Sequence, residues 1–340
     1  MDFLCQPHPQ PTGGLLLHAF EPRSFNKESL TKEFSWTDKI QINKKQLDKY
    51  TQHFMNFDFK QINNNGRKAL LLQIIELIDL TTLSGDDTAR VVKVLTLKAI
   101  QPLSKWLEVK LQSTAGSQVK DIESSVHTAA VCVYPARVKD VIEVLNTENA
   151  RDKVKVASVA GGFPSGQYLL ETRLHEIELL AKQQVDEVDI VIQRSLVLDK
   201  KWAELYSEIT QMREKCTSPI VMKTILSVGE LKTSENIYIA STIAILAGSD
   251  FIKTSTGKEK VNATIPAGIV MCDAIRTLRN LPSKKVGIKP AGGLSTFEDC
   301  VRWMYMVKCI LGPEYLTKDY FRIGASGLLD NLLRELEQCE

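Results

Sequence analysis

The chain has 340 residues, of which 44% are hydrophobic and 25% are charged, a composition typical of a globular protein with a sizeable core. Its 43 lysines and arginines nearly balance its 41 aspartates and glutamates, giving a formal net charge of +2. This balance, without any basic run, argues against a dedicated nucleic-acid or membrane-surface binder and leaves room only for a local cluster around a small anion.

The cysteines and the N-terminus indicate the compartment. None of the seven cysteines forms a CxxC pair, so neither a zinc site nor a disulfide framework is expected, and a reducing compartment is favoured. Asp2 stands where a secretory peptide would carry positive charge, and no apolar run is long enough to cross a membrane. We therefore expect a cytoplasmic protein without a metal or membrane contact.

In chain order, three regions differ in character. Residues 1–34 mix proline, glycine and isolated apolar residues without periodicity and are interpreted as a flexible tail. Residues 35–70 are weakly helical and polar, which predicts an N-terminal helical cap. Residues 71–340 change to short β-rich runs, each followed by a helical pattern, and are interpreted as one large domain.

Eight apolar runs in this domain predict strands. They are IIELIDL (74–80), TAAVCVY (128–134), VKVASVA (154–160), VDIVI (188–192), PIVMKTIL (219–226), DFIKT (250–254), KVGIKP (285–290) and YFRIG (320–324). After a longer first gap they start roughly 25 to 35 residues apart, the length of a strand, a helix and two loops.

Between the runs, apolar residues recur with helical spacing, as at Leu170, Leu174 and Ile177. Eight strands alternating with helices predict an α/β fold of the (β/α)8 TIM-barrel type with an N-terminal extension. An open doubly wound sheet is the competing fold, and it is disfavoured because no GxGxxG follows the first strand.

Polar residues at the carboxyl ends of these strands are the candidate site residues, because barrel chemistry sits at that face. They are Asp79, Cys132, Asp189, Lys223, Lys253, Lys289, Gly292, Gly293 and Gly324. Charged groups inside apolar strands persist only when they are paired or neutralised, so three lysines and two aspartates there predict a functional cluster.

Each candidate also has a purely structural interpretation. Lys223 is open to snorkelling at a strand end or to pairing in a structural network, and Cys132 to plain packing. Asp189 is either the counter-ion of a lysine or a proton carrier, and the two roles are compatible. The acidic stretch 85–88 is interpreted as a helix cap rather than a magnesium site.

Lys253 and Lys289 predict amine chemistry, since each lies in an apolar run followed by a glycine-bearing loop. An ordinary lysine, with a pKa of about 10.4, is protonated at neutral pH and cannot attack a carbonyl. Desolvation and a neighbouring ammonium both lower the pKa, and the free amine then forms an iminium ion that acts as an electron sink. Lys253 as nucleophile and Lys289 as its electrostatic tuner fit this chemistry.

Glycines in three consecutive loops predict an anion site. Gly257-Lys258, Gly292-Gly293 and Gly324-Ala325-Ser326 follow the sixth, seventh and eighth predicted strands. Backbone N–H groups in such loops bind phosphate in barrels of this kind. The predicted substrate is therefore a phosphorylated carbonyl compound.

Seven segments resemble the deoxyribose-phosphate aldolases, in their eukaryotic form, in order over about residues 71–335. They are IDLTTLSGDDT (78–88), AAVCVYPARV (129–138), VASVAGGFPSGQ (156–167), EVDIVI (187–192), DFIKTSTGK (250–258), KPAGG (289–293) and FRIGAS (321–326).

The resemblance implies a class I aldolase without metal or cofactor, which reversibly cleaves 2-deoxy-D-ribose 5-phosphate to D-glyceraldehyde 3-phosphate and acetaldehyde in deoxyribonucleotide catabolism. It implies that Lys253 forms the Schiff base, that Lys289 lowers the pKa of Lys253 and shares a proton relay, and that Asp189 transfers protons. Asp79, Cys132 and Lys223 are then expected to line the pocket.

Two positions depart from the family pattern at the phosphate end. Ser295 stands where the family often has a basic residue, and Gly327 where it often has serine or threonine. Weaker phosphate affinity is expected.

A transaldolase-type or fructose-bisphosphate-type aldolase and a sugar-phosphate-binding regulator remain as alternatives, and the sequence leaves a homo-oligomer open.

Overall fold

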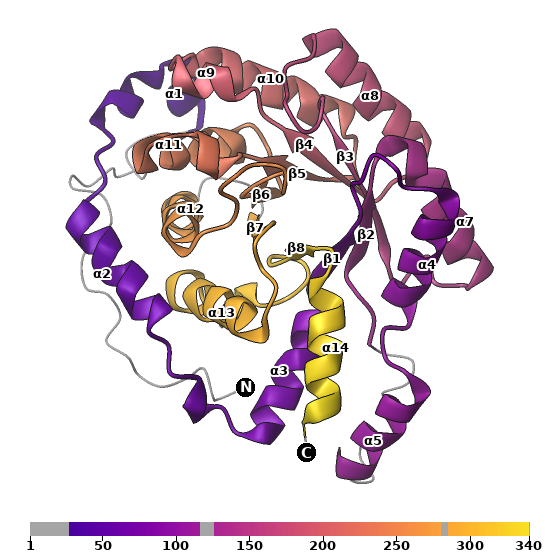
Figure 1. The fold of residues 1–340 in the computed structure, drawn as a ribbon. Coiled ribbons are helices and arrows are strands. Elements are labelled where there is room, and N and C mark those ends of the chain that lie inside the picture. The colour runs from indigo at the N-terminus through magenta and orange to yellow at the C-terminus, as the bar shows by residue number, and fades with distance from the viewer. Residues whose placement is uncertain (1–26, 116–125, 280–284, 340) are drawn as a thin grey trace.

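Eight parallel strands form the centre of the computed structural model, which describes residues 27–115, 126–279 and 285–339 (Figure 1). The strands are β1 (Ile78–Thr81), β2 (Ala130–Val133), β3 (Lys155–Ala160), β4 (Glu187–Val191), β5 (Val221–Ile225), β6 (Phe251–Lys253), β7 (Gly287–Lys289) and β8 (Ile323–Ala325). Nearly every strand residue is buried, as expected for parallel strands covered on both sides.

The strands close into a barrel. Their order is β7-β6-β5-β4-β3-β2-β1-β8, and β1 pairs in parallel with both β2 and β8. The remaining gap, between β7 and β8, is bridged at Ile288–Phe321 and at Ala291–Gly324. The predicted (β/α)8 barrel is thus confirmed, and the open sheet is not formed.

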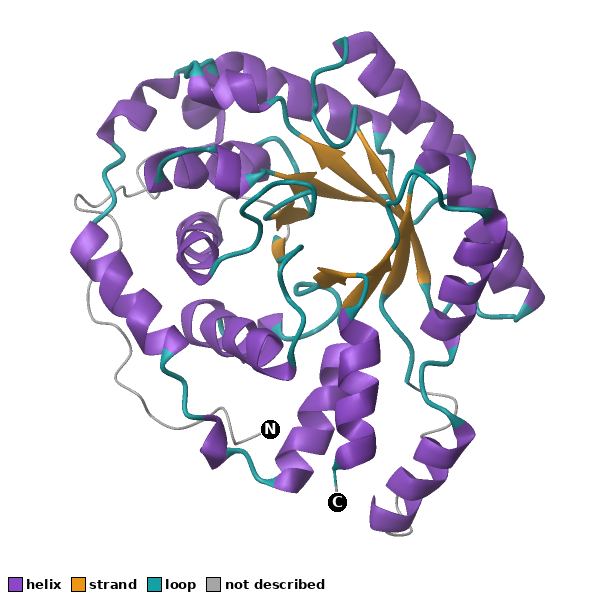
Figure 2. Cartoon of the chain, in the orientation of Figure 1, coloured by secondary structure: helices purple, strands orange, loops and turns teal. Residues whose placement is uncertain are grey.

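Helices surround the barrel on the outside (Figure 2). In chain order they are α4 (Ala89–Ile100), α5 (Lys105–Ala115), α7 (Val138–Thr147), α8 (Leu170–Lys182), α9 (Arg194–Leu198), α10 (Trp202–Lys215), α11 (Ser234–Leu246), α12 (Ile265–Leu278), α13 (Phe297–Leu311) and α14 (Leu328–Gln338). No helix within residues 27–115, 126–279 and 285–339 combines the length and the apolar character needed to cross a membrane.

The N-terminal extension supplies α1 (Lys27–Lys32), α2 (Lys44–Met55) and α3 (Asn64–Glu76). Helix α2 lies outside α12 and α13 (Figure 1) and buries Leu47, Tyr50 and Phe54 against them. This second layer explains why α12 is apolar on almost all sides, because a helix covered on both sides has no solvent face.

The structure differs from the expected boundaries at the start of the chain. Residues 1–26 of the expected tail lie outside the described residues, whereas α1 falls within 1–34 and fully buries Leu30. Helix α3 crosses the expected division between residues 70 and 71 and packs against α13 and α14. The extension is therefore joined to the barrel by a continuous helix.

The first and the last predicted strands begin about three to four residues too early, more than the others do. Residues 74–76, placed in the first strand, belong to α3, because Ile74 and Ile75 continue the apolar face of that helix. The last strand begins at Ile323 rather than at residue 320, since residues 321 and 322 make only bridge contacts with β7. All eight predicted strands nevertheless overlap the observed ones.

The strand register divides the barrel interior into two parts. One part is apolar and forms a cluster that we call the apolar wall. It consists of Leu83, Ala130, Cys132, Ala157, Val159, Phe163, Val191 and Ile225. The other part is charged. Side chains alternate along each strand, so Asp189, two residues before Val191, points into the barrel with it.

Candidate active site

Seven charged side chains meet inside the barrel, and we call them the charged cluster. They are Asp79 from β1, Glu187 and Asp189 from β4, Lys223 from β5, Lys253 from β6, Lys289 from β7 and Arg322, which directly precedes β8. None is more than 5% exposed. Burial of this kind is tolerated only because each charge contacts an opposite one.

Lys253 and Lys289 share one carboxylate oxygen. The Nζ atom of Lys253 lies 2.8 Å from Oδ2 of Asp189, and the Nζ atom of Lys289 lies 2.7 Å from the same oxygen. The two lysines are register partners on β6 and β7, which explains why their side chains enter the barrel at one level. The structure thus brings together the three residues to which the family resemblance assigns catalytic roles.

Lys223 and Asp79 hold this arrangement from below. Lys223 contacts Asp189 at 3.0 Å and Asp79 at 3.2 Å, and it also contacts Glu187. Asp79 in turn contacts Lys289. Lys223 is fully buried, so of its two structural interpretations the paired one describes it and snorkelling does not.

Arg322 and Glu187 complete the cluster, although the pattern of polar residues at strand ends predicts neither. The Arg322 guanidinium lies 2.6 Å from Asp79 and 2.8 Å from Glu187. A signal existed, because Arg322 interrupts the apolar run 320–324 and Glu187 stands two residues before Asp189 on the same face of β4. Reading only the carboxyl ends of strands hides residues one layer deeper.

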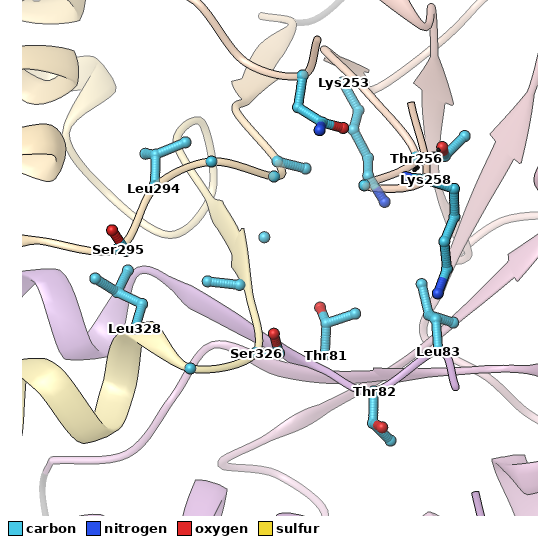
Figure 3. A pocket seen from close by; sticks show the side chains of 18 of the residues that line it. Thr81, Thr82, Leu83, Lys253, Thr256, Lys258, Leu294, Ser295, Ser326 and Leu328 are labelled. Atoms are coloured by element: carbon cyan, nitrogen blue, oxygen red, sulfur yellow. Dashed lines mark hydrogen bonds between the residues drawn. The ribbon is translucent and has the colours of Figure 1, made fainter. Parts of the chain in front are cut away.

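A cavity of about 530 Å³ opens above the cluster. Lys253 points into it, with Lys258 on one side and Ser295 on the opposite side (Figure 3). Its lining includes Thr81, Thr82, Leu83, Ser84, Thr256, Asn262 and Leu294, and also every residue expected at the phosphate, namely Gly257, Lys258, Gly292, Gly293, Gly324 and Ser326. Ser295 and Gly327, the two departures from the family pattern, line it as well.

The pocket residues expected from the resemblance are placed differently. Asp79, Cys132 and Lys223 do not line this cavity and lie fully buried beneath it. The reason is their position along the strands, which puts Asp79 and Lys223 in the charged cluster and Cys132 in the apolar wall. Their expected role at the substrate pocket stays a prediction.

The phosphate-side lining is built from backbone. Gly292 has a φ of +78°, and a Cβ atom there would lie 2.7 Å from Cγ of Asn262, so the tight loop requires glycine. Helix α14 begins beside this loop, and its N-cap residue Gly327 supplies no side-chain cap. Helix α13 differs, because Thr296 and Asp299 form a capping box at its start. The N-terminus of α14 thus reaches the cavity without a side-chain cap.

The electrostatics distinguish the two lysines. Burial, together with the Lys289 ammonium, lowers the pKa of Lys253 against the opposing pull of Asp189. Burial acts on Lys289 too, but Asp189 and Asp79 outweigh it and raise the pKa of Lys289. At neutral pH Lys289 is therefore the cation of the pair, and Lys253 is the amine more readily freed of its proton.

The carboxylates stay ionised. Burial opposes the charge on Asp189, but Lys223, Lys253 and Lys289 together hold the pKa of this carboxyl well below its usual range. The thiol of Cys132 behaves oppositely, because burial and the charge of Asp189 raise its pKa. Cys132 is therefore a neutral packing residue, in agreement with its structural interpretation.

Stretch 85–88 acts as a helix cap. The Thr88 side chain accepts a hydrogen bond from the backbone N–H of Val91 at the start of α4. Asp87 accepts hydrogen bonds from the Thr82 hydroxyl at 2.7 Å and from the Ser84 backbone N–H at 2.9 Å. Within the stretch 85–88 the capping residue is therefore Thr88, whereas Asp87 binds the loop that precedes the helix.

Comparison with known proteins adds the following findings. The model of the DeoC/LacD family aldolases matches residues 73–306. A deoxyribose-phosphate aldolase of Mus musculus is 45% identical over 304 residues, covering 89% of this chain and 92% of that protein. The corresponding protein of Homo sapiens is 44% identical over 304 residues, with the same coverage.

Solved structures show the same fold. A structure from Toxoplasma gondii superposes with a TM-score of 0.68 at 19% identity, covering 82% of this chain and 98% of that one. The tetrameric deoxyribose phosphate aldolase from Aeropyrum pernix superposes with a TM-score of 0.57 at 19% identity, covering 81% and 99%. At this identity the likeness concerns the fold alone.

Proposed function

This chain belongs to the DeoC/LacD family of aldolases, and we propose that it reversibly cleaves 2-deoxy-D-ribose 5-phosphate to D-glyceraldehyde 3-phosphate and acetaldehyde through a Schiff base on Lys253. Relatives at about 45% identity over most of the chain carry the substrate assignment. One observation carries the mechanism. Among the lysines of the charged cluster, Lys253 lines the cavity and has a lowered pKa.

The first steps add the amine to the sugar. The uncharged Nζ of Lys253 attacks C1 of the open-chain aldehyde and gives a carbinolamine. Lys289, which stays an ammonium, is suited to donate the proton that lets the C1 hydroxyl leave as water. Both amines contact one oxygen of Asp189, which supports a short path by which the proton lost from Lys253 returns to Lys289.

The next steps break the carbon–carbon bond. The Asp189 carboxylate, through a water molecule, accepts the proton of the C3 hydroxyl, and the C2–C3 electron pair moves into the iminium as glyceraldehyde phosphate leaves. The enamine that remains on Lys253 takes a proton at C2, and hydrolysis of the resulting iminium releases acetaldehyde. Asp189 is suited to the accepting role because it remains ionised.

The apolar wall supports a two-carbon donor. Ile225 is the register partner of Lys253, and Cys132 and Val191 belong to the same wall. Of this wall, Leu83 lines the cavity, so a hydroxyl on the carbon next to the iminium that turned toward the wall would find little hydrogen bonding there, and a buried hydroxyl without a partner is costly. This favours an unsubstituted acetaldehyde unit over the dihydroxyacetone unit used by the rival aldolases.

The far end of the cavity supports a phosphate. The glycine loops and Lys258 line the cavity, and Ser326 and Leu328, at the uncapped N-terminus of α14, lie across it from Lys253 (Figure 3). Helix N-termini attract anions. Gly257, Lys258, Gly292, Gly293, Gly324 and Ser326 are assigned to the phosphate on this basis.

Borohydride trapping tests the proposal. Incubation with 2-deoxy-D-ribose 5-phosphate and reduction should leave a stable adduct on the peptide that contains Lys253. Lys253→Arg should lose both the adduct and the cleavage activity. Exposed Lys285→Arg serves as the matched control and should retain both. An adduct on any other lysine, or turnover without an adduct, would contradict the assignment.

Two further expectations stay predictions. A homo-oligomer is consistent with the tetrameric structure of the Aeropyrum pernix protein. A cytoplasmic location fits the cysteine usage and a sugar-phosphate substrate.

A further inference from the structure

The charged cluster contains an unequal number of charges. Four side chains are basic, namely Lys223, Lys253, Lys289 and Arg322, and three are carboxylates, namely Asp79, Glu187 and Asp189. All seven are buried, where an uncompensated charge is expensive. The cluster is electrically neutral only when one basic group has lost its proton.

Contacts with carboxylates decide which group that is. Among the salt bridges of the described residues, Lys223 contacts three carboxylates, and Lys289 and Arg322 contact two each. Lys253 contacts one, Asp189. When the other three cations balance the three carboxylates, the charge on Lys253 is the one left least compensated.

We propose that Arg322 is a positioning residue that keeps the Lys253 amine uncharged. With Glu187 it forms the bottom of the charged cluster, which we call the barrel floor. Its positive charge balances Glu187 and Asp79, which would otherwise favour protonation of the lysines above them. The guanidinium contacts both carboxylates, at 2.8 Å and 2.6 Å. It does not line the cavity, so it acts through other groups and not on the substrate. This inference rests on the proposed function, because it assumes that the free amine of Lys253 reacts.

The path from Arg322 to Lys253 is continuous. Glu187, held by Arg322, also contacts Lys223, which contacts Asp189 at 3.0 Å. Asp79, held by Arg322 as well, contacts Lys289. Both branches end on Asp189, the one carboxylate that contacts Lys253 within the described part of the chain. Loss of the Arg322 charge should therefore change the protonation of the Lys253 amine.

Lys258 lines the same cavity but forms none of the cluster's salt bridges among the described residues, and the remaining groups around Lys253 do not supply a substitute cation. Within the described residues, β2 contributes the neutral thiol of Cys132, β3 contributes Ala157 and Val159, and β8 contributes Gly324. Arg322 remains charged at any working pH, since burial lowers its pKa but Glu187 and Asp79 outweigh that effect and raise the pKa above its ordinary, already strongly basic value. The floor charge is therefore permanent, unlike that of a lysine.

Removal of a positive charge and removal of a negative charge at the barrel floor should shift the pKa of Lys253 in opposite directions. Arg322→Gln removes a cation, so a third ammonium becomes favourable and Lys253 binds its proton more tightly. The acid limb of the kcat/KM profile for 2-deoxy-D-ribose 5-phosphate should then move to higher pH. On the falling part of the profile, kcat/KM drops about tenfold for every pH unit by which the limb rises. Glu187→Gln removes an anion, and its acid limb should move to lower pH.

Restored charge balance provides the control. The double variant Arg322→Gln/Glu187→Gln removes one charge of each sign, and its acid limb should return toward that of the wild type. Arg322→Lys, which keeps the charge, should shift the limb less than Arg322→Gln. A structural role alone would lower kcat in each variant without moving the limb, and the double variant would be no better than either single one.

The experiment measures the kcat/KM profile of each folded full-length variant, after borohydride trapping has located the adduct of the wild type on Lys253. A limb that stays in place in Arg322→Gln, or that moves the same way in both single variants, overturns the inference. If Arg322→Gln does not fold, Glu187→Gln and the double variant decide, and an unshifted limb in Glu187→Gln is the contrary result. Absence of a wild-type adduct on Lys253 would instead refute the proposed function.

Discussion

At the scale of single residues, Asp189 lies between two amines with different protonation behaviour. One of its oxygens accepts a hydrogen bond from each amine, at 2.8 Å from Lys253 and 2.7 Å from Lys289. Asp79 also contacts Lys289, and this second carboxylate keeps it charged. The chemistry therefore depends on an asymmetry of one carboxylate contact between two neighbouring lysines.

Removal of the Lys289 charge should shift the pH dependence of catalysis. An amine reacts only when unprotonated, so activity falls as the pH drops through the pKa of Lys253. The Lys289 ammonium lowers that pKa, and Lys289→Met should move the acid limb of kcat/KM to higher pH and reduce turnover at neutral pH. Exposed Lys285→Met is the control and should leave the profile in place. An unchanged limb in Lys289→Met would exclude the tuning role.

The phosphate end gives a second residue-scale prediction. Ser295 lines the cavity where the resembling family often has a basic residue. Ser295→Arg should lower KM for 2-deoxy-D-ribose 5-phosphate by up to about fivefold, since an exposed charge pair contributes at most about 1 kcal/mol. KM for unphosphorylated 2-deoxyribose should not change. Ser295→Met matches the added length without the charge, and an equal effect in both variants would refute the phosphate assignment.

Sequence alone could predict the top layer of the site but not its floor. Lys253, Lys289 and Asp189 were identified because charged residues in apolar runs have few structural explanations. Arg322 does interrupt an apolar run, and Glu187 does share a strand face with Asp189, but the contact that pairs them spans 135 positions of the chain, and no local pattern encodes it. For the same reason, nothing in the sequence distinguished the cavity lining from the layer beneath it.

At the scale of elements, strand β7 positions Lys289 through a glycine. A Cβ atom on Gly287 would lie 2.4 Å from Cε1 of Phe251 on β6 and 2.7 Å from the backbone oxygen of Tyr320. The small residue lets the Phe251 ring fill the barrel interior beneath Lys253, its neighbour two positions along β6. The packing of Phe251 against Gly287 thus fixes the level along the barrel at which the side chains of Lys253 and Lys289 point into its interior.

Gly287→Ala should destabilise the protein by about 1–3 kcal/mol, because overpacking a filled interior forces the strands apart. Chemical denaturation followed by circular dichroism gives the free energy of unfolding. Gly85→Ala is the matched control, since a Cβ atom there meets nothing within 4 Å, and its stability should stay close to that of the wild type. Equal stability of the two variants would contradict the packing account.

Periodicity predicted the existence of the elements better than their ends. Strands in the middle of the barrel were placed to within about two residues, because turn residues bound each apolar run. The first strand was extended into α3, since Ile74 and Ile75 suit a helix face and a buried strand equally. Apolar runs at the junction of a helix and a strand carry no local signal that separates them.

At the scale of the whole molecule, the N-terminal extension is part of the barrel's core packing. Helix α2 covers α12 and α13, and α3 runs directly into β1. Phe54 of α2 is fully buried and lies edge-on to Tyr305 of α13, with ring centroids 5.7 Å apart. We therefore expect the extension and the barrel to unfold together.

Phe54→Ala should lower the free energy of unfolding by about 3–5 kcal/mol and shift one cooperative transition of the whole protein. Activity at temperatures well below the transition should remain, because Phe54 is remote from the charged cluster. Met55→Ala, at an exposed neighbour, should change stability by no more than about 0.5 kcal/mol. A separate early transition in Phe54→Ala, with the barrel unaffected, would mean that the extension folds independently.

Direct titration of the Lys253 amine tests the central claim most directly. Nitrogen-15 NMR of lysine-labelled protein, with the signal assigned through Lys253→Arg, reports the protonation of this one side chain across the pH range. The account predicts a midpoint well below the value of about 10.4 for an ordinary lysine, with Lys289 still protonated at that midpoint. A Lys253 midpoint near the ordinary value, or Lys289 losing its proton first, would contradict it.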